Sequence, residues 1–202
     1  MAIFAATVLQ LAVATFVSGV PQFEGKAFAS RLVAYPAMML AVPVVWALLR
    51  RKSDRIVPID WGAVAFLMAP FLVDMTGNSA NFYDTIYWWD DANHLVNWFF
   101  LCMGAGLILR HVRDLRPWEL TFMITGFGAF MAILWELAEW YTFIRHGTEL
   151  ETAYEDTLGD MALGTTGALI AGLLMAWRAR SSKQKLGAGN TEREGFEPSM
   201  EL

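Results

Sequence analysis

The chain has 202 residues, of which 56% are hydrophobic and only 17% are charged, and its net charge is −5 at pH 7. The apolar share exceeds the ordinary level of about 45–50%, and the charged share is below the usual ~25%. This composition argues against a soluble globular protein and against a basic protein that binds nucleic acid. Cys102 is the single cysteine, which excludes a disulfide framework and a cysteine-based metal site within the chain.

Six apolar runs follow one another along the chain, and each is about as long as a membrane-spanning helix requires. They cover residues 1–20, 32–49, 61–77, 95–109, 120–135 and 161–177. A span crosses roughly 30 Å of hydrocarbon at about 1.5 Å per residue, which each run achieves with its flanks. The first run has no basic residue ahead of it, so we expect a retained helix rather than a signal peptide. The sequence predicts an all-α, polytopic transmembrane helical bundle of about six spans.

Basic residues alternate between the predicted loops and indicate the topology. Most of them follow the second, fourth and sixth runs: Arg50, Arg51, Lys52, Arg55, Arg110, Arg113, Arg116, Arg178, Arg180, Lys183 and Lys185. The opposite side holds only Lys26, Arg31 and Arg145. Because cytoplasmic loops are enriched in Lys and Arg, both termini are predicted to be cytoplasmic. We expect one transmembrane domain over 1–178 and a disordered cytoplasmic tail over 179–202, where the sequence is polar and aperiodic.

Acidic residues gather on the outer side of this topology, at the outer ends of spans four, five and six. Three groups stand at helical spacing there: Asp90, Asp91 and His94; Glu136 and Glu139; and Asp156 and Asp160. Residues three or four apart share one face of a helix, so each span can present two ligands in one direction. Carboxylates inside a membrane are costly, and several together repel one another. We therefore expect protons, a cation or a basic partner to neutralise them.

A divalent-cation site is the first hypothesis for these groups. Carboxylate oxygens with one imidazole suit Mg, Mn, Ca or non-haem Fe better than structural zinc. The predicted metal ligands are Asp90, Asp91, His94, Glu136, Glu139, Asp156 and Asp160. Simpler roles remain open for some of them: His94 could make an interhelical hydrogen bond, and Asp156 could complement a helix dipole. Glu149, Glu151 and Glu155 are expected to lie in a solvated loop.

The three helical motifs together resemble the YjdF-like family of bacterial inner-membrane proteins. The resemblance rests on Asp90-x-x-x-His94, Glu136-x-x-Glu139-Trp140 and Asp156-Thr157-x-x-Asp160, in this order on successive spans and within about 84–177. A weaker likeness is to VanZ-like membrane proteins, which also begin a helix with Asp-x-x-x-His. The Gly-Asp pair that usually precedes the Asp-Thr in the YjdF-like family is missing here. The resemblance implies a multi-pass protein of the bacterial inner membrane, and it supplies no reaction.

Three functions are compatible with this pattern. In the first, the outer pocket binds a divalent cation and acts on an accessible lipid, a polyprenyl phosphate or another envelope substrate through a metal-activated water or a metal-held phosphate. In the second, the acids and His94 belong to a proton- or cation-coupled transporter. In the third, they fix helix register in a structural or accessory protein. The expected partners are membrane lipids, and no feature calls for nucleic acid; whether the chain is an enzyme stays open at this point.

Overall fold

The computed structural model describes residues 1–51, 58–142, 144–146 and 152–194. Each predicted apolar run forms one long helix: α1 (Ala2–Phe16), α2 (Phe28–Arg50), α3 (Trp61–Ser79), α5 (Trp89–Val112), α6 (Pro117–Thr142) and α7 (Ala153–Glu194). Three short elements lie between them: η1 (Pro21–Phe23), α4 (Phe82–Thr85) and η2 (Ile144–His146). The described residues contain no strand, which confirms the predicted all-α class.

Local sequence signals account for where several helices begin. The carboxylate of Asp60 accepts hydrogen bonds from the backbone N–H groups of Gly62 at 2.8 Å and Ala63 at 3.1 Å, which caps α3. At the start of α6, Pro117 occupies the first helical position, and the Glu119 carboxylate accepts from the backbone N–H of Arg116 at 2.7 Å. The prolines inside α2 and α3 (Pro36, Pro43 and Pro70) interrupt neither helix, as is common in membrane helices.

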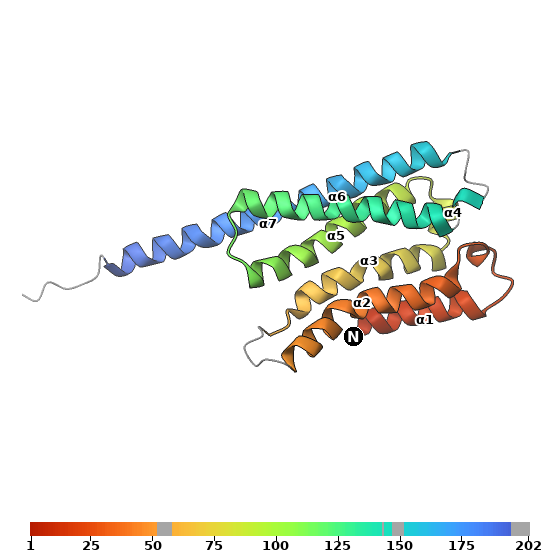
Figure 1. The fold of residues 1–202 in the computed structure, drawn as a ribbon, viewed down its shortest axis with the longest axis horizontal. Coiled ribbons are helices and arrows are strands. Elements are labelled where there is room, and N and C mark those ends of the chain that lie inside the picture. The colour runs from red at the N-terminus through yellow and green to blue at the C-terminus, as the bar shows by residue number, and fades with distance from the viewer. Residues whose placement is uncertain (52–57, 143, 147–151, 195–202) are drawn as a thin grey trace, which may run out of the picture.

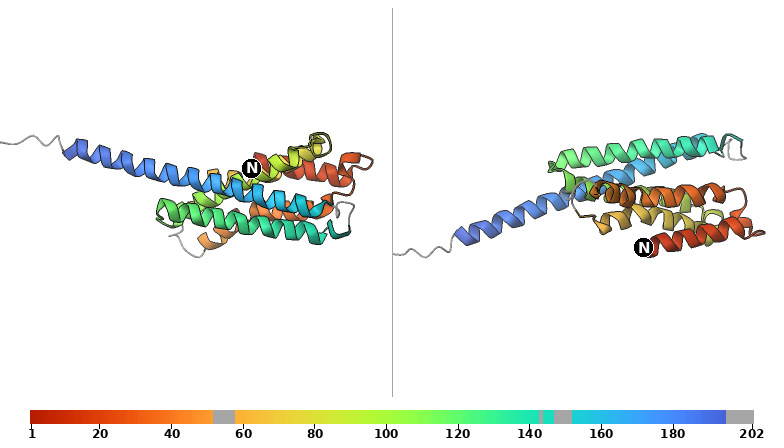
Figure 2. Two further views of the ribbon diagram at one scale, coloured as in Figure 1. Left: turned by 90° about the horizontal axis from the view of Figure 1, so that it is seen from above. Right: turned by 60° about the horizontal axis from the view of Figure 1, so that its bottom comes forward.

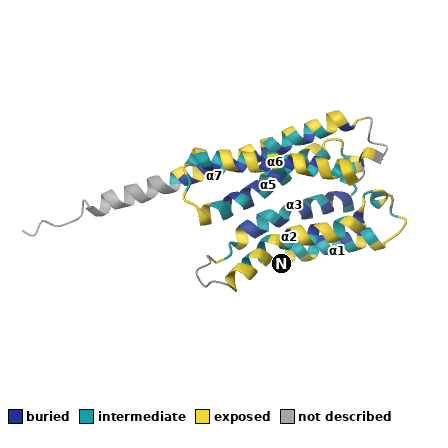
Figure 3. Ribbon diagram, viewed as in Figure 1, coloured by how far each residue is buried: buried dark blue, intermediate teal, exposed yellow. Residues whose placement is uncertain are grey.

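The helices pack as two groups of three. Leu11, Tyr35, Met39, Met68 and Met75 form the core of the group made by α1, α2 and α3. The second core lies between α5, α6 and α7, and includes Cys102, Met103, Leu120, Ile124 and Met175. Contacts between α3 and α5 join the two groups, and the remaining faces of the helices are exposed or of intermediate burial (Figure 3). Many large apolar side chains are exposed there, among them Leu9, Phe122 and Trp177, as expected for surfaces that face lipid.

The chain runs up and down, so alternate connections share one end of the bundle. The last residues of α1, α3 and α6 lie at one end, and those of α2 and α5 lie at the other, from which α7 extends (Figure 1). The basic segments predicted to be cytoplasmic therefore lie opposite the acidic motifs. Which end faces the cytoplasm stays a prediction.

The number of spans is supported for four helices within the described residues. Phe28–Arg50, Trp89–Val112, Pro117–Thr142 and Ala153–Ser181 are long and apolar enough to cross a membrane. The 15 residues of α1 would reach only about 22 Å at the usual rise. Helix α3 carries the polar residues Asp74 and Asn78 in its last two turns. These two helices pack with α2 in one core, and the count of six spans stays a prediction.

Helix α7 continues beyond the bundle, past residue 178, where we expected a disordered tail to begin. It reaches Glu194 and projects from the other helices (Figure 2). Arg, Ala, Lys and Gln are frequent just after residue 177, and they are good helix formers. Extending an existing helix avoids the cost of nucleation, which explains the continuation. Residues 195–202 lie outside the described residues, and the division of the chain at residue 178 stays a prediction.

Candidate functional site

Close packing of α5, α6 and α7 brings the polar motifs together at the end of the bundle opposite the α7 extension. A Cβ atom added to Gly164 would lie 2.7 Å from Cδ1 of Trp98 and 3.1 Å from the Cβ of Ala132. A Cβ atom on Gly167 would collide with the backbone carbonyl of Leu95 and lie 3.0 Å from the backbone nitrogen of Phe99. Small residues thus let the backbones approach closely, one to two turns from Asp160.

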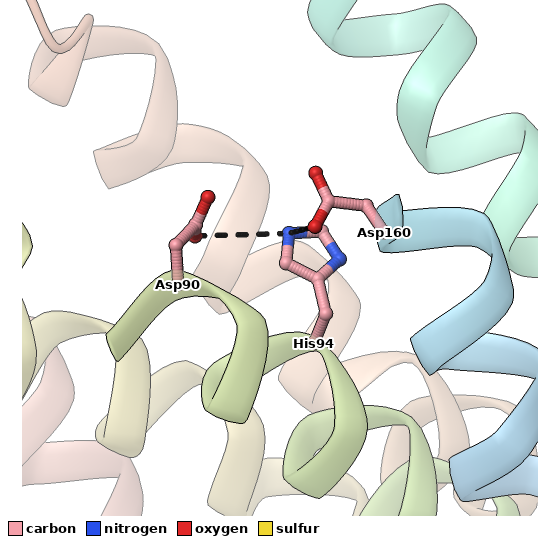
Figure 4. Close-up of side chains that lie close together, drawn as sticks. All are labelled: Asp90, His94 and Asp160. Atoms are coloured by element: carbon pink, nitrogen blue, oxygen red, sulfur yellow. Dashed lines mark ion pairs between the residues drawn. The ribbon is translucent and has the colours of Figure 1, made fainter. Parts of the chain in front are cut away.

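Four side chains from these helices form what we call the acid–histidine cluster: Asp90 and His94 on α5, Glu136 on α6 and Asp160 on α7. The Nε2 atom of His94 lies 3.6 Å from Oδ1 of Asp160 and 3.8 Å from Oδ1 of Asp90 (Figure 4). One ligand atom from each of these three residues lies within 4.8 Å of the other two. The Nδ1 atom of His94 lies 3.9 Å from Oε1 of Glu136. Side chains from three helices therefore surround one imidazole ring.

Three of the four side chains in the cluster are largely buried. The side chains of Glu136 and Asp160 are each 5% exposed and that of His94 is 11% exposed, whereas Asp90 is 47% exposed. Within the described part of the chain, His94 is the basic group within 4.0 Å of Glu136 and of Asp160. One imidazolium cannot balance three carboxylates. Ionised acids at this position need further positive charge, since isolated buried charges are strongly unfavourable.

The other predicted ligands lie outside this group. Asp91 and Asp156 are exposed, in the first turns of α5 and α7. Glu139 is half-buried, one turn along α6 from Glu136. Glu149 and Glu151 lie outside the described residues. The structure therefore brings together one residue deeper in the bundle from each predicted motif, namely His94, Glu136 and Asp160. Asp90, from the first turn of α5, joins them.

A second polar group, here called the Asp74 network, joins the two halves of the bundle. The Asp74 carboxylate on α3 accepts hydrogen bonds from the hydroxyl groups of Tyr35 at 2.9 Å and Tyr83 at 2.7 Å. It also accepts from the guanidinium of Arg31 at 3.2 Å and the amide of Asn78 at 3.3 Å. The side chains of Arg31 and Asp74 are 19% and 15% exposed. This ion pair between α2 and α3 is therefore largely removed from solvent.

The network continues onto α5, beside His94. The Asn93 amide donates to the Tyr83 hydroxyl, and the Asn97 amide donates to Oδ1 of Asn93 at 2.8 Å. Burial, and then the Asp74 charge, raise the pKa of Tyr83. The phenol therefore stays protonated and remains able to donate to Asp74. The first turns of α5 are thus tied to α3 on one face, while His94 meets α6 and α7 on another.

The sequence reasoning did not find the Asp74 network. Asp74 was one of many acids on the predicted outer side, and Arg31 was one of three basic residues there. Asp74 lies within an apolar run, and Arg31 is one of the few basic residues on the same predicted side, so the sequence did contain a signal for an ion pair between them. Helical spacing could not reveal it, because these two residues belong to different helices. The roles of Tyr35, Asn78 and Tyr83 depend on that pairing.

Replacing Gly167 by Ala is expected to destabilise the protein by about 1–3 kcal/mol, because the new methyl group would meet the rigid backbone of α5. Gly126→Ala on α6 is the matched control, since a Cβ atom there has no neighbour within 4 Å. That change should be neutral or stabilising by up to ~1 kcal/mol through helix propensity. Thermal unfolding in detergent, followed by tryptophan fluorescence, measures both. Equal stability of the two variants would contradict the close approach of α5 and α7.

Comparison with known families places most of the chain in one group. The model of a family described as "Predicted membrane protein (DUF2238)" matches residues 3–181, which include the acid–histidine cluster and the Asp74 network. This match confirms the resemblance to the YjdF-like family, whereas the likeness to VanZ-like proteins receives no support. No curated protein and no solved structure matches the chain.

Proposed function

We propose that this chain, which belongs to the DUF2238 family of predicted membrane proteins, binds a divalent cation at its acid–histidine cluster. The proposed ligands are Asp90, the Nε2 atom of His94 and Asp160. Asp91, Glu136, Glu139 and Asp156 are left out of the set, because they lie outside the group of ligand atoms within 4.8 Å of one another. The seven ligands predicted from sequence are thereby reduced to those that face a common point.

The spacing of the ligand atoms is the observation that carries this proposal. Oxygen and nitrogen ligands of one cation lie about 3.0–3.9 Å apart when the metal–ligand bonds are about 2.1–2.4 Å long. The separations of 3.6 Å and 3.8 Å from Nε2 of His94 fall in that range. They are longer than hydrogen bonds, which reach about 3.2 Å. A cation between these atoms would also supply the positive charge that the buried carboxylates require.

The chemistry of the donor atoms indicates which metals and which class of substrate the site suits. Two carboxylates and one imidazole suit Mn, Fe or Mg, and Ca where further oxygen ligands complete the shell. Three protein ligands leave positions for water or for a phosphate oxygen, and a bound cation can polarise either. Asp90 is the half-exposed member, so a ligand would approach from its side. We extend the proposal to a phosphate-bearing lipid of the outer leaflet, such as a polyprenyl phosphate, as the substrate class.

Metal analysis of the purified full chain tests the proposal. Mass spectrometry of the detergent-purified protein should find a near-stoichiometric divalent metal. After removal with a chelator, titration with Mn²⁺, Mg²⁺, Ca²⁺ or Fe²⁺ should restore thermal stability. At 100 times the dissociation constant, the gain is about 2.7 kcal/mol. Glu155→Gln, which removes an exposed acid near the start of α7, should bind equally well and serves as the control.

The transporter and structural alternatives make different predictions in the same experiment. A structural role gives neither bound metal nor a cation-dependent shift in stability. A proton-coupled transporter also lacks the metal, and it instead shows uptake in proteoliposomes that Glu136→Gln abolishes. Protein without metal that no divalent cation stabilises would overturn the proposal, and protonated carboxylates would then account for the cluster.

A further inference from the structure

We infer that Glu136 is a positioning residue that accepts a hydrogen bond from Nδ1–H of His94 and thereby directs Nε2 at the cation; this inference rests on the proposed function. The two ring nitrogens face different helices. Nε2 faces Asp90 on α5 and Asp160 on α7, at 3.8 Å and 3.6 Å. Nδ1 faces Glu136 on α6, at 3.9 Å. The carboxylates therefore fall into two sets, one on each side of the imidazole.

The unsatisfied nitrogen of His94 shows what Glu136 does there. The Nδ1 atom is buried and has no hydrogen-bond partner. When a neutral imidazole binds a cation through Nε2, its proton resides on Nδ1. That N–H would be a buried donor, and buried donors are costly when they stay unpaired. The Oε1 atom of Glu136 is the acceptor opposite it, and a movement of about 1 Å brings the two atoms into hydrogen-bonding distance.

Glu136 is itself held in place by the helix that carries Asp160. Its side chain is 5% exposed, and we expect the hydroxyl group of Thr157 on α7, which is close enough to influence the Glu136 carboxylate, to support it. Asp160 follows Thr157 by three residues, on the same face of α7. One helix thus supplies a cation ligand and also fixes the acceptor for the imidazole. In metal sites, such a carboxylate orients the histidine, fixes its tautomer and raises its basicity as a ligand.

Cation affinity separates this role from that of a ligand. In titrations of the metal-free protein with Mn²⁺, Glu136→Leu should weaken binding roughly 10–100-fold and leave the saturating stoichiometry unchanged. Glu136→Gln keeps a carbonyl acceptor and should lose less. Thr157→Val leaves every carboxylate in place and removes only the anchor, so a still smaller loss is expected. If Glu136→Leu does not fold, the other two variants carry the test.

Pulsed electron paramagnetic resonance of the Cu²⁺-loaded protein measures the coupling to the remote imidazole nitrogen, which a general loss of stability would not change. Modulation from the remote nitrogen of a bound imidazole reports the hydrogen bond at that nitrogen. The wild type should show one imidazole bound through Nε2, and the Glu136 variants should shift the remote-nitrogen coupling while the directly bound nitrogen stays. Thr157→Val should shift it in the same direction.

The outcomes distinguish failure of this inference from failure of the proposed function. Wild-type protein without bound cation overturns both. A wild type that binds, with Glu136→Leu reducing the stoichiometry as a ligand substitution would, makes Glu136 a direct ligand and overturns the inference alone. Unchanged affinity and an unchanged remote-nitrogen coupling in Glu136→Leu would also overturn it, because Nδ1–H would then have another partner.

Discussion

Replacing Asp160 by Asn is expected to abolish cation binding at the cation concentrations that saturate the wild type. Asp160 is 5% exposed, and its Oδ1 lies 3.6 Å from Nε2 of His94. The acids nearest to it on α7, Glu155 and Asp156, are exposed and cannot take its place. The change removes a charged ligand and nearly preserves the side-chain volume. The loss of affinity should therefore exceed the roughly 10–100-fold effect of removing a supporting partner. Titration of the metal-free protein, followed by bound-metal analysis, measures it.

Stability of the metal-free variant separates this prediction from a purely structural role. Neutralising Asp160 relieves repulsion among the buried acids, so metal-free Asp160→Asn should be at least as stable as the metal-free wild type, without a cation-dependent gain. Asp156→Asn is the matched control, because it makes the same change on the same helix at an exposed position. It should bind like the wild type. Normal binding by Asp160→Asn, or equal losses in both variants, would contradict the assignment of Asp160 as a ligand.

Replacing Asp74 by Leu is expected to destabilise the protein by about 3–5 kcal/mol, because it leaves the largely buried Arg31 guanidinium without its carboxylate. The hydroxyl groups of Tyr35 and Tyr83 lose the same acceptor. Adding Arg31→Met should recover much of the loss, because the unpaired charge is then gone. Unfolding of the single and double variants in detergent forms a double-mutant cycle that isolates the pair.

A more exposed acid–base pair at the same end of the bundle supplies the control. Lys26 and Asp84 lie 3.1 Å apart, with side chains that are 26% and 48% exposed. Exposed pairs contribute about 0–1 kcal/mol, so Asp84→Leu should have a small effect. Similar losses for Asp74→Leu and Asp84→Leu would show that burial of the Arg31–Asp74 pair does not determine its contribution.

Helical periodicity carried most of what could be predicted for the fold and part of what could be predicted for the site. The apolar runs marked every long helix, and i,i+4 spacing placed Asp90 and His94 on one face of α5. Because three motifs occur at corresponding ends of successive helices, the meeting of His94, Glu136 and Asp160 followed from an up-and-down bundle. That Asp90, His94 and Asp160 bind a metal stays a prediction.

Properties that depend on contacts between distant helices were beyond the sequence pattern. Asp156 and Asp160 are four residues apart and share one face of α7, yet only Asp160 of the two is buried. Asp156 lies in the first turn of α7, and Asp160 lies one turn farther along the helix, where α5 and α6 pack against it, so contacts between helices at that level decide which of the two is buried. The assignment of Glu136 and Asp160 to different nitrogens of His94 likewise depends on side-chain positions that spacing does not specify.

The position of Asp160 on the last long helix has a consequence for how the protein is made. Ribosomes deliver the helices in chain order, so α5 and α6 enter the membrane carrying His94 and Glu136 before their partner on α7 exists. During that interval these polar groups face lipid or the insertion machinery, and they favour retention beside it until α7 arrives. Docking of α7 thus pairs these groups, and a chain truncated before α7 would leave His94 and Glu136 without their partner on that helix.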